Sequence, residues 1–168
     1  EMMEGFGSSD EVIDATIEII RQPNLAFKEN IQELIDKSGL QGPDFPTYGE
    51  IKNDGGILDA LTTGRGSFKI RAKHTIESKD NDKTSIVFTE LPYQVNKAKL
   101  IENIAQLVRD KKINEISNLR DESDKDGMRL VIELKRGEQH EVVLGSLYKH
   151  TNAQISYSVN MVCLVNGE

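Results

Sequence analysis

The sequence of 168 residues has one cysteine, no tryptophan and only nine phenylalanines and tyrosines. A lone thiol, Cys163, cannot form an internal disulfide, so the sequence gives no sign of an oxidising compartment. Its apolar neighbours predict that Cys163 occupies a buried strand position. The sequence also lacks an apolar run near the roughly 20 residues that cross a bilayer and a basic-then-apolar signal at its N-terminus. These absences exclude a disulfide-stabilised or helical membrane-spanning class and leave a globular domain.

Acidic residues are concentrated at the start of the chain. The formal net charge is -7, but residues 1–50 alone carry -8, so residues 51–168 carry +1. The overall acidity therefore does not exclude local basic surfaces in the longer part of the chain.

Hydrophobic periodicity predicts an α+β protein. The expected strands cover 67–77, 85–91, 116–120, 128–134 and 154–165, and the expected helices cover 57–62, 96–109 and 138–150. After the helix at 57–62, the order is ββαββαβ, which indicates a sheet with helices packed on one face. A short helical segment precedes it. Its first helix carries apolar Val12, Ile13, Ile17 and Ile20, and its second ends at Gly39. We therefore expect a helical lead-in over 1–50 and an α+β domain over 51–168.

The expected strand at 67–77 carries basic side chains on one face. Because strand side chains alternate, Lys69, Arg71 and Lys73 should project together, about 6.6 Å apart, with Arg65 just upstream. Such spacing is close to that of phosphates along a DNA strand, so the row could follow a nucleic-acid backbone without reading its sequence. Periodicity alone favours the simpler alternative, a solvated outer face.

Two further basic residues lie where a helix should begin. Asn96 is a good N-cap, which places Lys97 and Lys99 in the first helical turn. Exposed amides at that position also favour phosphate. A solvated helix end explains these two lysines equally well.

An acidic turn separates the strands at 116–120 and 128–134. Glu122, Asp124, Asp126 and Gly127 nearly match a calcium-binding loop. However, the first ligand position is Glu, and a strand pattern follows where a second helix would be required. Asp and Gly also suit a tight hairpin, so we interpret the segment as a hairpin and expect no metal site.

No group of residues has the spacing of a catalytic site. The three histidines, His74, His140 and His150, share no spacing with Cys163 or with a pair of carboxylates. We therefore predict no catalytic residue, no metal ligand and no cofactor within this chain.

Several short sequence motifs carry a family resemblance over residues 10–168. They are GPDFPT, TGRG, LPYQVNKAKL, LRDESDKDGMR and NMV. Together they resemble the A subunit of bacterial type IIA DNA topoisomerases, closer to the A subunit of DNA gyrase than to the topoisomerase IV equivalent. The resemblance identifies the chain as the tower region, preceded by helices of the DNA-gate domain, and thus as a fragment of a longer protein.

The resemblance implies an ATP-dependent isomerase that breaks, passes and rejoins double-stranded DNA, and so supercoils it. In the family, Mg²⁺ and ATP are used through the B subunit of an A2B2 complex, and the enzyme is cytoplasmic and chromosome-associated. The DNA-cleaving tyrosine follows an arginine, whereas the four tyrosines here follow Thr47, Pro92, Leu147 and Ser156. The chain alone should therefore bind double-stranded DNA through its basic residues without cleaving it. In the parent A2B2 complex its expected partners are the B subunit and a second A subunit, and no contact with a membrane is expected.

An alternative is a non-catalytic α/β module that binds RNA or a small ligand. RNA-binding sheets usually expose stacking aromatics. None stands between Lys69, Arg71 and Lys73, which counts against RNA.

Overall fold

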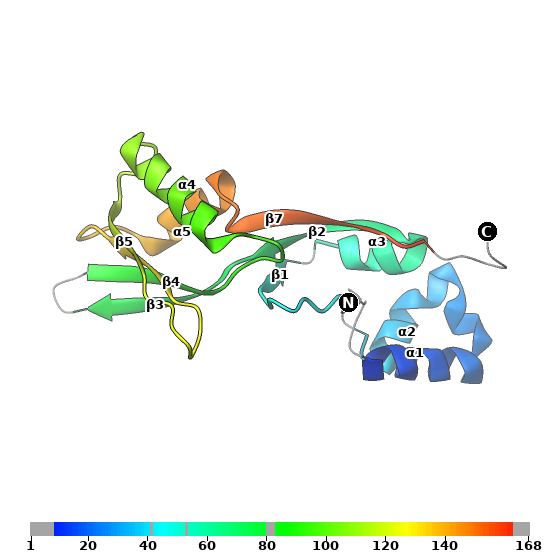
Figure 1. Ribbon diagram of the computed structural model, residues 1–168. Helices are drawn as coiled ribbons and strands as arrows, with labels where there is room; N and C mark the ends of the chain where they lie inside the picture. The colour runs from blue at the N-terminus through cyan, green and yellow to red at the C-terminus, as the bar shows by residue number, and fades with distance from the viewer. Residues whose placement is uncertain (1–8, 41, 53, 80–82, 163–168) are drawn as a thin grey trace. The chain divides into compact units, whose positions relative to one another are not determined.

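The computed structural model describes residues 9–40, 42–52, 54–79 and 83–162 (Figure 1). The α-helices are α1 (Ser9–Arg21), α2 (Ile31–Ser38), α3 (Gly56–Thr63), α4 (Lys97–Arg109) and α5 (His140–His150), with short 3-10 turns η1 (Pro23–Ala26) and η2 (Lys28–Asn30) between α1 and α2. The strands are β1 (Glu50–Lys52), β2 (Arg65–Arg71), β3 (Lys73–Lys79), β4 (Lys83–Glu90), β5 (Ile116–Asp121), β6 (Leu130–Leu134) and β7 (Gln154–Asn160). No helix in these described ranges is long and apolar enough to cross a membrane.

The chain divides into two compact units. Unit 1 consists of Glu1–Pro46, Lys52–Lys69 and Ser156–Glu168, and unit 2 consists of Thr47–Ile51 and Ile70–Ile155. These bounds describe packing within this chain, so the expected domain division at residue 50 remains a prediction.

The helices of unit 1 enclose a small apolar cluster. Leu25 and Leu34 are buried there with Ala15 and Leu40. Gly39 ends α2 in a left-handed conformation, φ 72°, in which its N–H donates to Ile35 O, as expected for a glycine after a helix. The expected apolar positions of α1 are nevertheless exposed: Val12, Ile13, Ile17 and Ile20. In unit 1, α1 instead contributes Ala15 and the partly buried Ile19 to the cluster.

An aromatic cluster anchors the connector that follows α2. The ring of Phe45 lies 6.4 Å from that of Phe68 on β2 and 5.0 Å from that of Tyr157 on β7. Phe45 and Phe68 are both buried. The extended connector around the two prolines is therefore fixed by ring packing rather than by regular secondary structure.

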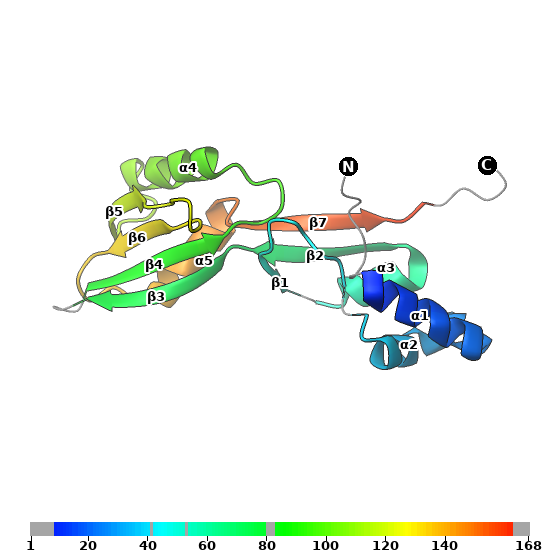
Figure 2. The ribbon, with the colours of Figure 1, turned by 60° about the horizontal axis from the view of Figure 1, so that its bottom comes forward.

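The main core of unit 2 lies between a four-stranded sheet and two helices. The strand order is β3–β4–β6–β5, and each neighbouring pair is antiparallel; the strands lie side by side in Figure 2. Ile86, Phe88 and Ile132 from the sheet pack with Leu100 of α4 and Leu147 of α5. Both helices lie on one side of β3 and β4 in Figure 1. This arrangement confirms the α+β class, with helices against one face of the sheet.

The single strand expected over 67–77 is wrong. It is interrupted at Ala72, so β2 belongs to a three-stranded sheet of order β1–β2–β7, whereas β3 belongs to the four-stranded sheet. Strand β1 has no counterpart among the expected strands. The last strand ends at Asn160 instead of 165, and Cys163 lies outside the described residues.

Candidate nucleic-acid interface

The sequence TGRG presents Arg65 at the start of β2. Gly64 ends α3 with φ 74°, and its N–H donates to Ala60 O at 2.8 Å. Gly66 serves a different purpose, because a Cβ there would lie 2.0 Å from Gly56 O, in the backbone of α3. The first glycine thus supplies a left-handed turn, and the second allows β2 and α3 to approach closely. Arg65 is exposed between them.

The outward face of β2 carries cations over a buried inner face. Phe68 and Ile70 are buried, whereas Arg65 and Lys69 are exposed. Neither cation forms an ion pair with any other residue that the structure describes. This alternation follows from strand geometry and leaves both charges available to a ligand.

Arg71 ends β2 and is held by two neighbours in unit 2. Its Nε donates to Gln154 Oε1 at 2.7 Å. Its guanidinium carbon lies 4.7 Å from the centre of the Tyr148 ring, a cation–π distance. Unlike Lys69, Arg71 is half-buried, and its side chain is fixed before any ligand arrives.

Lys73 begins β3, on the other side of the interruption. Its Nζ lies 3.2 Å from Glu90 Oε1, and Glu90 Oε2 accepts from Gly49 N–H at 2.8 Å. Glu90 thus joins Lys73 to the backbone at Gly49. Because Ala72 separates the two strands, Lys73 does not continue the regular row of β2, and a phosphate near Lys73 would compete with a carboxylate.

The N-terminus of α4 forms as the sequence predicts. Asn96 Oδ1 accepts from the N–H of Lys99 at 3.0 Å, which confirms the N-cap. Lys97 Nζ lies 2.8 Å from Asp121 Oδ2. The hydrogen bond from Lys97, followed by those from Ser123, lowers the pKa of Asp121 to about 2. Lys99 is exposed and has no ion pair with another described side chain.

The acidic turn is a hairpin, as interpreted from the sequence. Glu122 N–H donates to Arg129 O at 2.8 Å, and Asp124 and Gly127 form an antiparallel bridge. The carboxylate of Glu122 accepts from Arg129 at 3.1 Å and from Arg120 at 3.1 Å. These two bonds, in that order, lower the pKa of Glu122. Its charge is therefore balanced by arginines of the same hairpin.

The arginines extend this network over the sheet. Arg129 donates both Nη groups to the carboxylate of Glu77 on β3, each at 2.7 Å, and Arg120 Nη1 donates to Glu133 Oε1 at 2.7 Å. Over the described ranges, no group of three or more His, Cys, Asp or Glu side chains could hold a metal ion. Glu77, Glu122 and Glu133 therefore act as partners of arginine.

Tyr148 is a titratable group for which the sequence predicted no role. Burial raises its pKa to about 12, which is opposite to the lowering that would activate a nucleophile. Its OH donates to Ala72 O at 3.2 Å and lies 3.3 Å from His74 Nδ1. Tyr148 therefore has the surroundings of a structural residue. Because it lies 76 positions from Ala72, no local pattern could have indicated this contact.

Comparison with known proteins identifies relatives along almost the whole chain. The family model for the A subunit of DNA gyrase/topoisomerase IV matches residues 8–168. The DNA gyrase A subunit of Pseudomonas aeruginosa is 51% identical over 160 residues, which are 94% of this chain and 17% of that protein. The corresponding proteins of Clostridium acetobutylicum and a Synechocystis species are each 49% identical, over 157 and 161 residues, with 94% of this chain and 18% of each relative covered. The chain thus spans less than a fifth of the length of these relatives.

Proposed function

Because this chain belongs to the family of DNA gyrase/topoisomerase IV A subunits, we propose that it is a DNA-binding part of the A subunit of a type IIA topoisomerase. The parent enzyme changes DNA topology by breaking, passing and rejoining a duplex. Within it, this chain is the tower region and contributes electrostatic positioning of the duplex. Mg²⁺ and ATP act through the B subunit of an A2B2 complex, which works in the cytoplasm on the bacterial chromosome.

The observation that carries this proposal is the outward face of β2. Arg65 and Lys69 are exposed and form no ion pair with another described residue, while Phe68 and Ile70 anchor the strand from its inner side. Exposed cations on an anchored strand suit the sequence-independent binding of phosphates. Arg71, Lys73, Lys97 and Lys99 are proposed as further contacts. Of these, Lys73 and Lys97 would exchange a carboxylate partner for a phosphate.

The chain on its own is proposed to bind DNA without cleaving it. None of its four tyrosines follows an arginine, and the raised pKa of Tyr148 disfavours the phenolate. An RNA-stacking sheet is less well supported, because Phe45 and Phe68 are buried in a ring cluster.

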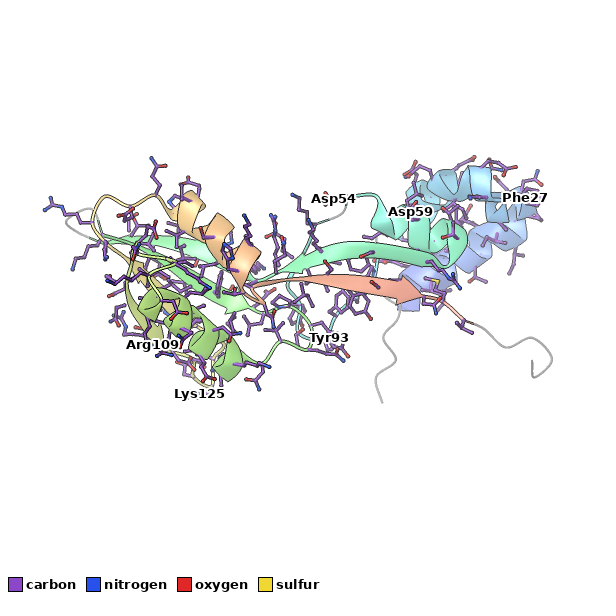
Figure 3. The ribbon with its side chains drawn as sticks, turned by 90° about the horizontal axis from the view of Figure 1, so that it is seen from above. Phe27, Asp54, Asp59, Tyr93, Arg109 and Lys125 are labelled. Atoms are coloured by element: carbon purple, nitrogen blue, oxygen red, sulfur yellow. The ribbon has the colours of Figure 1, made fainter. Side chains whose placement is uncertain are left out.

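The test is duplex-DNA binding by fluorescence anisotropy at about 50 to 200 mM salt. We would compare the 168-residue chain with an Arg65→Gln/Lys69→Gln variant. The control, Arg109→Gln/Lys125→Gln, removes the same charge from exposed positions on α4 and in the hairpin turn, both labelled in Figure 3. Neither Arg109 nor Lys125 has an ion pair among the described residues.

Each phosphate contact contributes about -0.9 to the slope of log affinity against log salt. We expect the β2 variant to lose affinity and to shift the slope by about 2 units, and the control to keep the wild-type slope. Equal slopes for both variants would overturn the assignment of the interface to β2.

A further inference from the structure

We propose that Arg71 is a preorganised binding site for a phosphodiester of the DNA backbone, with Tyr148 and Gln154 as its positioning residues. This inference rests on the proposed DNA-binding function and assigns it to one geometry. It gives Arg71 a role that differs from that of the exposed cations Arg65 and Lys69, which supply charge without a fixed direction.

The guanidinium of Arg71 is constrained on one face and at one nitrogen. The ring of Tyr148 lies against it at 4.7 Å, and its Nε donates to Gln154 Oε1 at 2.7 Å. Its Nη groups donate to no other residue that the structure describes. Two donors of a planar fork therefore remain available on a side chain whose orientation is already fixed.

The residues that hold Arg71 are themselves attached to the backbone of the residue that follows it in the chain. Tyr148 OH donates to Ala72 O at 3.2 Å, and Ala72 N–H donates to Ala153 O at 2.7 Å. Ala72 follows Arg71, and Ala153 precedes Gln154. The C=O of Ala72 thus holds the ring of Tyr148, and its N–H holds Ala153, the neighbour of Gln154, at the end of β2. Arg71, Tyr148 and Gln154 therefore belong to one connected network within unit 2.

The chemistry of the site fits a phosphate. A guanidinium fork donates two parallel hydrogen bonds to the oxygens of a phosphate or carboxylate, and arginine is more weakly hydrated than lysine. No acidic residue lies between Asp59 and Glu77 in the sequence. The charge of Glu50 reaches Tyr148, but no ion pair joins Glu50 to Arg71. The fork thus keeps its charge for an external anion such as a phosphate of the DNA backbone.

Preorganisation predicts that Arg71→Lys is not a conservative change. Lysine keeps the charge, so the salt dependence of binding should not change, but it has neither the fork nor the flat face that stacks on Tyr148. Tyr148→Leu removes the stacking ring and keeps an apolar side chain. If the ring acts through Arg71, its removal should matter only while Arg71 is present.

The experiment is a double-mutant cycle of Arg71→Lys and Tyr148→Leu in the 168-residue chain, with duplex-DNA affinity and its salt slope as readouts. We expect each single variant to bind about three- to tenfold more weakly at an unchanged slope, as for loss of a cation–π contact and a bidentate bond. The double variant should bind no more weakly than the weaker single one. Tyr148→Phe keeps the ring and should stay close to wild type.

A second cycle uses Gln154→Leu in place of Tyr148→Leu. It becomes the deciding test if circular dichroism shows that the Tyr148→Leu variant does not fold. Additive losses in the usable cycle, or a Tyr148→Phe variant as weak as Tyr148→Leu, would overturn this inference. The Arg65→Gln/Lys69→Gln variant separates the two proposals. If it weakens binding while the cycle is additive, only the role of Arg71 fails; if the wild-type chain does not bind DNA, the proposed function fails as well.

Discussion

Lys97 Nζ lies 2.8 Å from Asp121 Oδ2, so an ion pair joins the first turn of α4 to the last residue of β5. Asp121 also accepts from the hydroxyl of Ser123 at 2.6 Å and from its N–H at 3.1 Å. One carboxylate therefore organises both the helix end and the start of the hairpin turn. A phosphate that approached Lys97 would compete with this partner, so of the two DNA contacts proposed at the start of α4, Lys97 is the less favourable one.

The Lys97–Asp121 pair predicts a loss of stability in acid. Because its pKa is lowered from 3.8 to about 2 in the folded protein, Asp121 stabilises the fold above about pH 4, and this contribution disappears as the pH falls from 4 to 2. The pair is partly exposed, so we expect Asp121→Asn to lower the free energy of unfolding at pH 7 by only about 0.5 kcal/mol. Urea unfolding of both proteins at pH 7, 4 and 2 measures this. A difference that stays the same at all three values would contradict the assignment.

Because one apolar face of α1 is exposed, we predict that substitutions of apolar residues in this helical segment have unequal effects on the free energy of unfolding. Ile20 is 74% exposed and Leu34 is 6% exposed. Ile20→Ser should change the free energy of unfolding by less than about 0.5 kcal/mol, because isoleucine and serine have similar helix propensity. Leu34→Ala should cost about 2 to 5 kcal/mol, because it leaves a cavity in the cluster.

Urea denaturation followed by circular dichroism compares the two variants under the same conditions. Phe27, which Figure 3 labels on the same segment, is also exposed, and Phe27→Ser is a second surface control. A loss at Ile20 as large as that at Leu34 would show that the apolar face of α1 is covered in solution.

Two glycines that look alike in sequence should respond oppositely to alanine. A Cβ at Gly66 would lie 2.0 Å from Gly56 O and 2.8 Å from Ala60 N, whereas a Cβ at Gly145 in α5 would meet nothing within 4 Å. Gly66→Ala should destabilise by about 1 to 3 kcal/mol, because β2 must move away from α3. Gly145→Ala should stabilise by about 0.5 to 1 kcal/mol, because alanine restricts the unfolded chain and favours helix. Thermal unfolding of the two variants tests both signs, and a stable Gly66→Ala would refute the close approach.

Local patterns in the sequence predicted most elements, because caps, glycines and periodicity act over a few residues. Asn96 caps α4 and Gly39 ends α2 as expected. The interruption at Ala72 could not be predicted, since apolar and polar residues keep alternating through it while the hydrogen-bonding partner changes from one sheet to another. Likewise, the pattern of α1 defines an apolar face but does not say what covers it.

The sequence predicted which charged side chains of the candidate site are exposed, but it did not predict the contacts that hold them. Exposed Arg65 and Lys69 follow from alternation along one strand. By contrast, Gln154 lies 83 residues from Arg71, the residue whose orientation it helps to fix. Such long-range partners depend on the fold and cannot be read from a local pattern. The DNA-binding role of each basic residue stays a prediction.

The burial of Tyr148 predicts a late titration in alkali. Burial is the main cause that raises its pKa from 10.0 to about 12, and the nearby Arg71 opposes the shift. Because the folded pKa exceeds the unfolded one, the neutral phenol stabilises the fold fully below about pH 10, and this contribution is lost as the pH rises towards 12. Absorbance at the phenolate band should therefore show one tyrosine that ionises late in the folded chain and normally in urea. In Tyr148→Phe the late absorbance change should be smaller by the contribution of one tyrosine. If the late absorbance change in this variant is as large as in the wild type, Tyr148 does not carry it, and its ring is more accessible to water than its burial indicates.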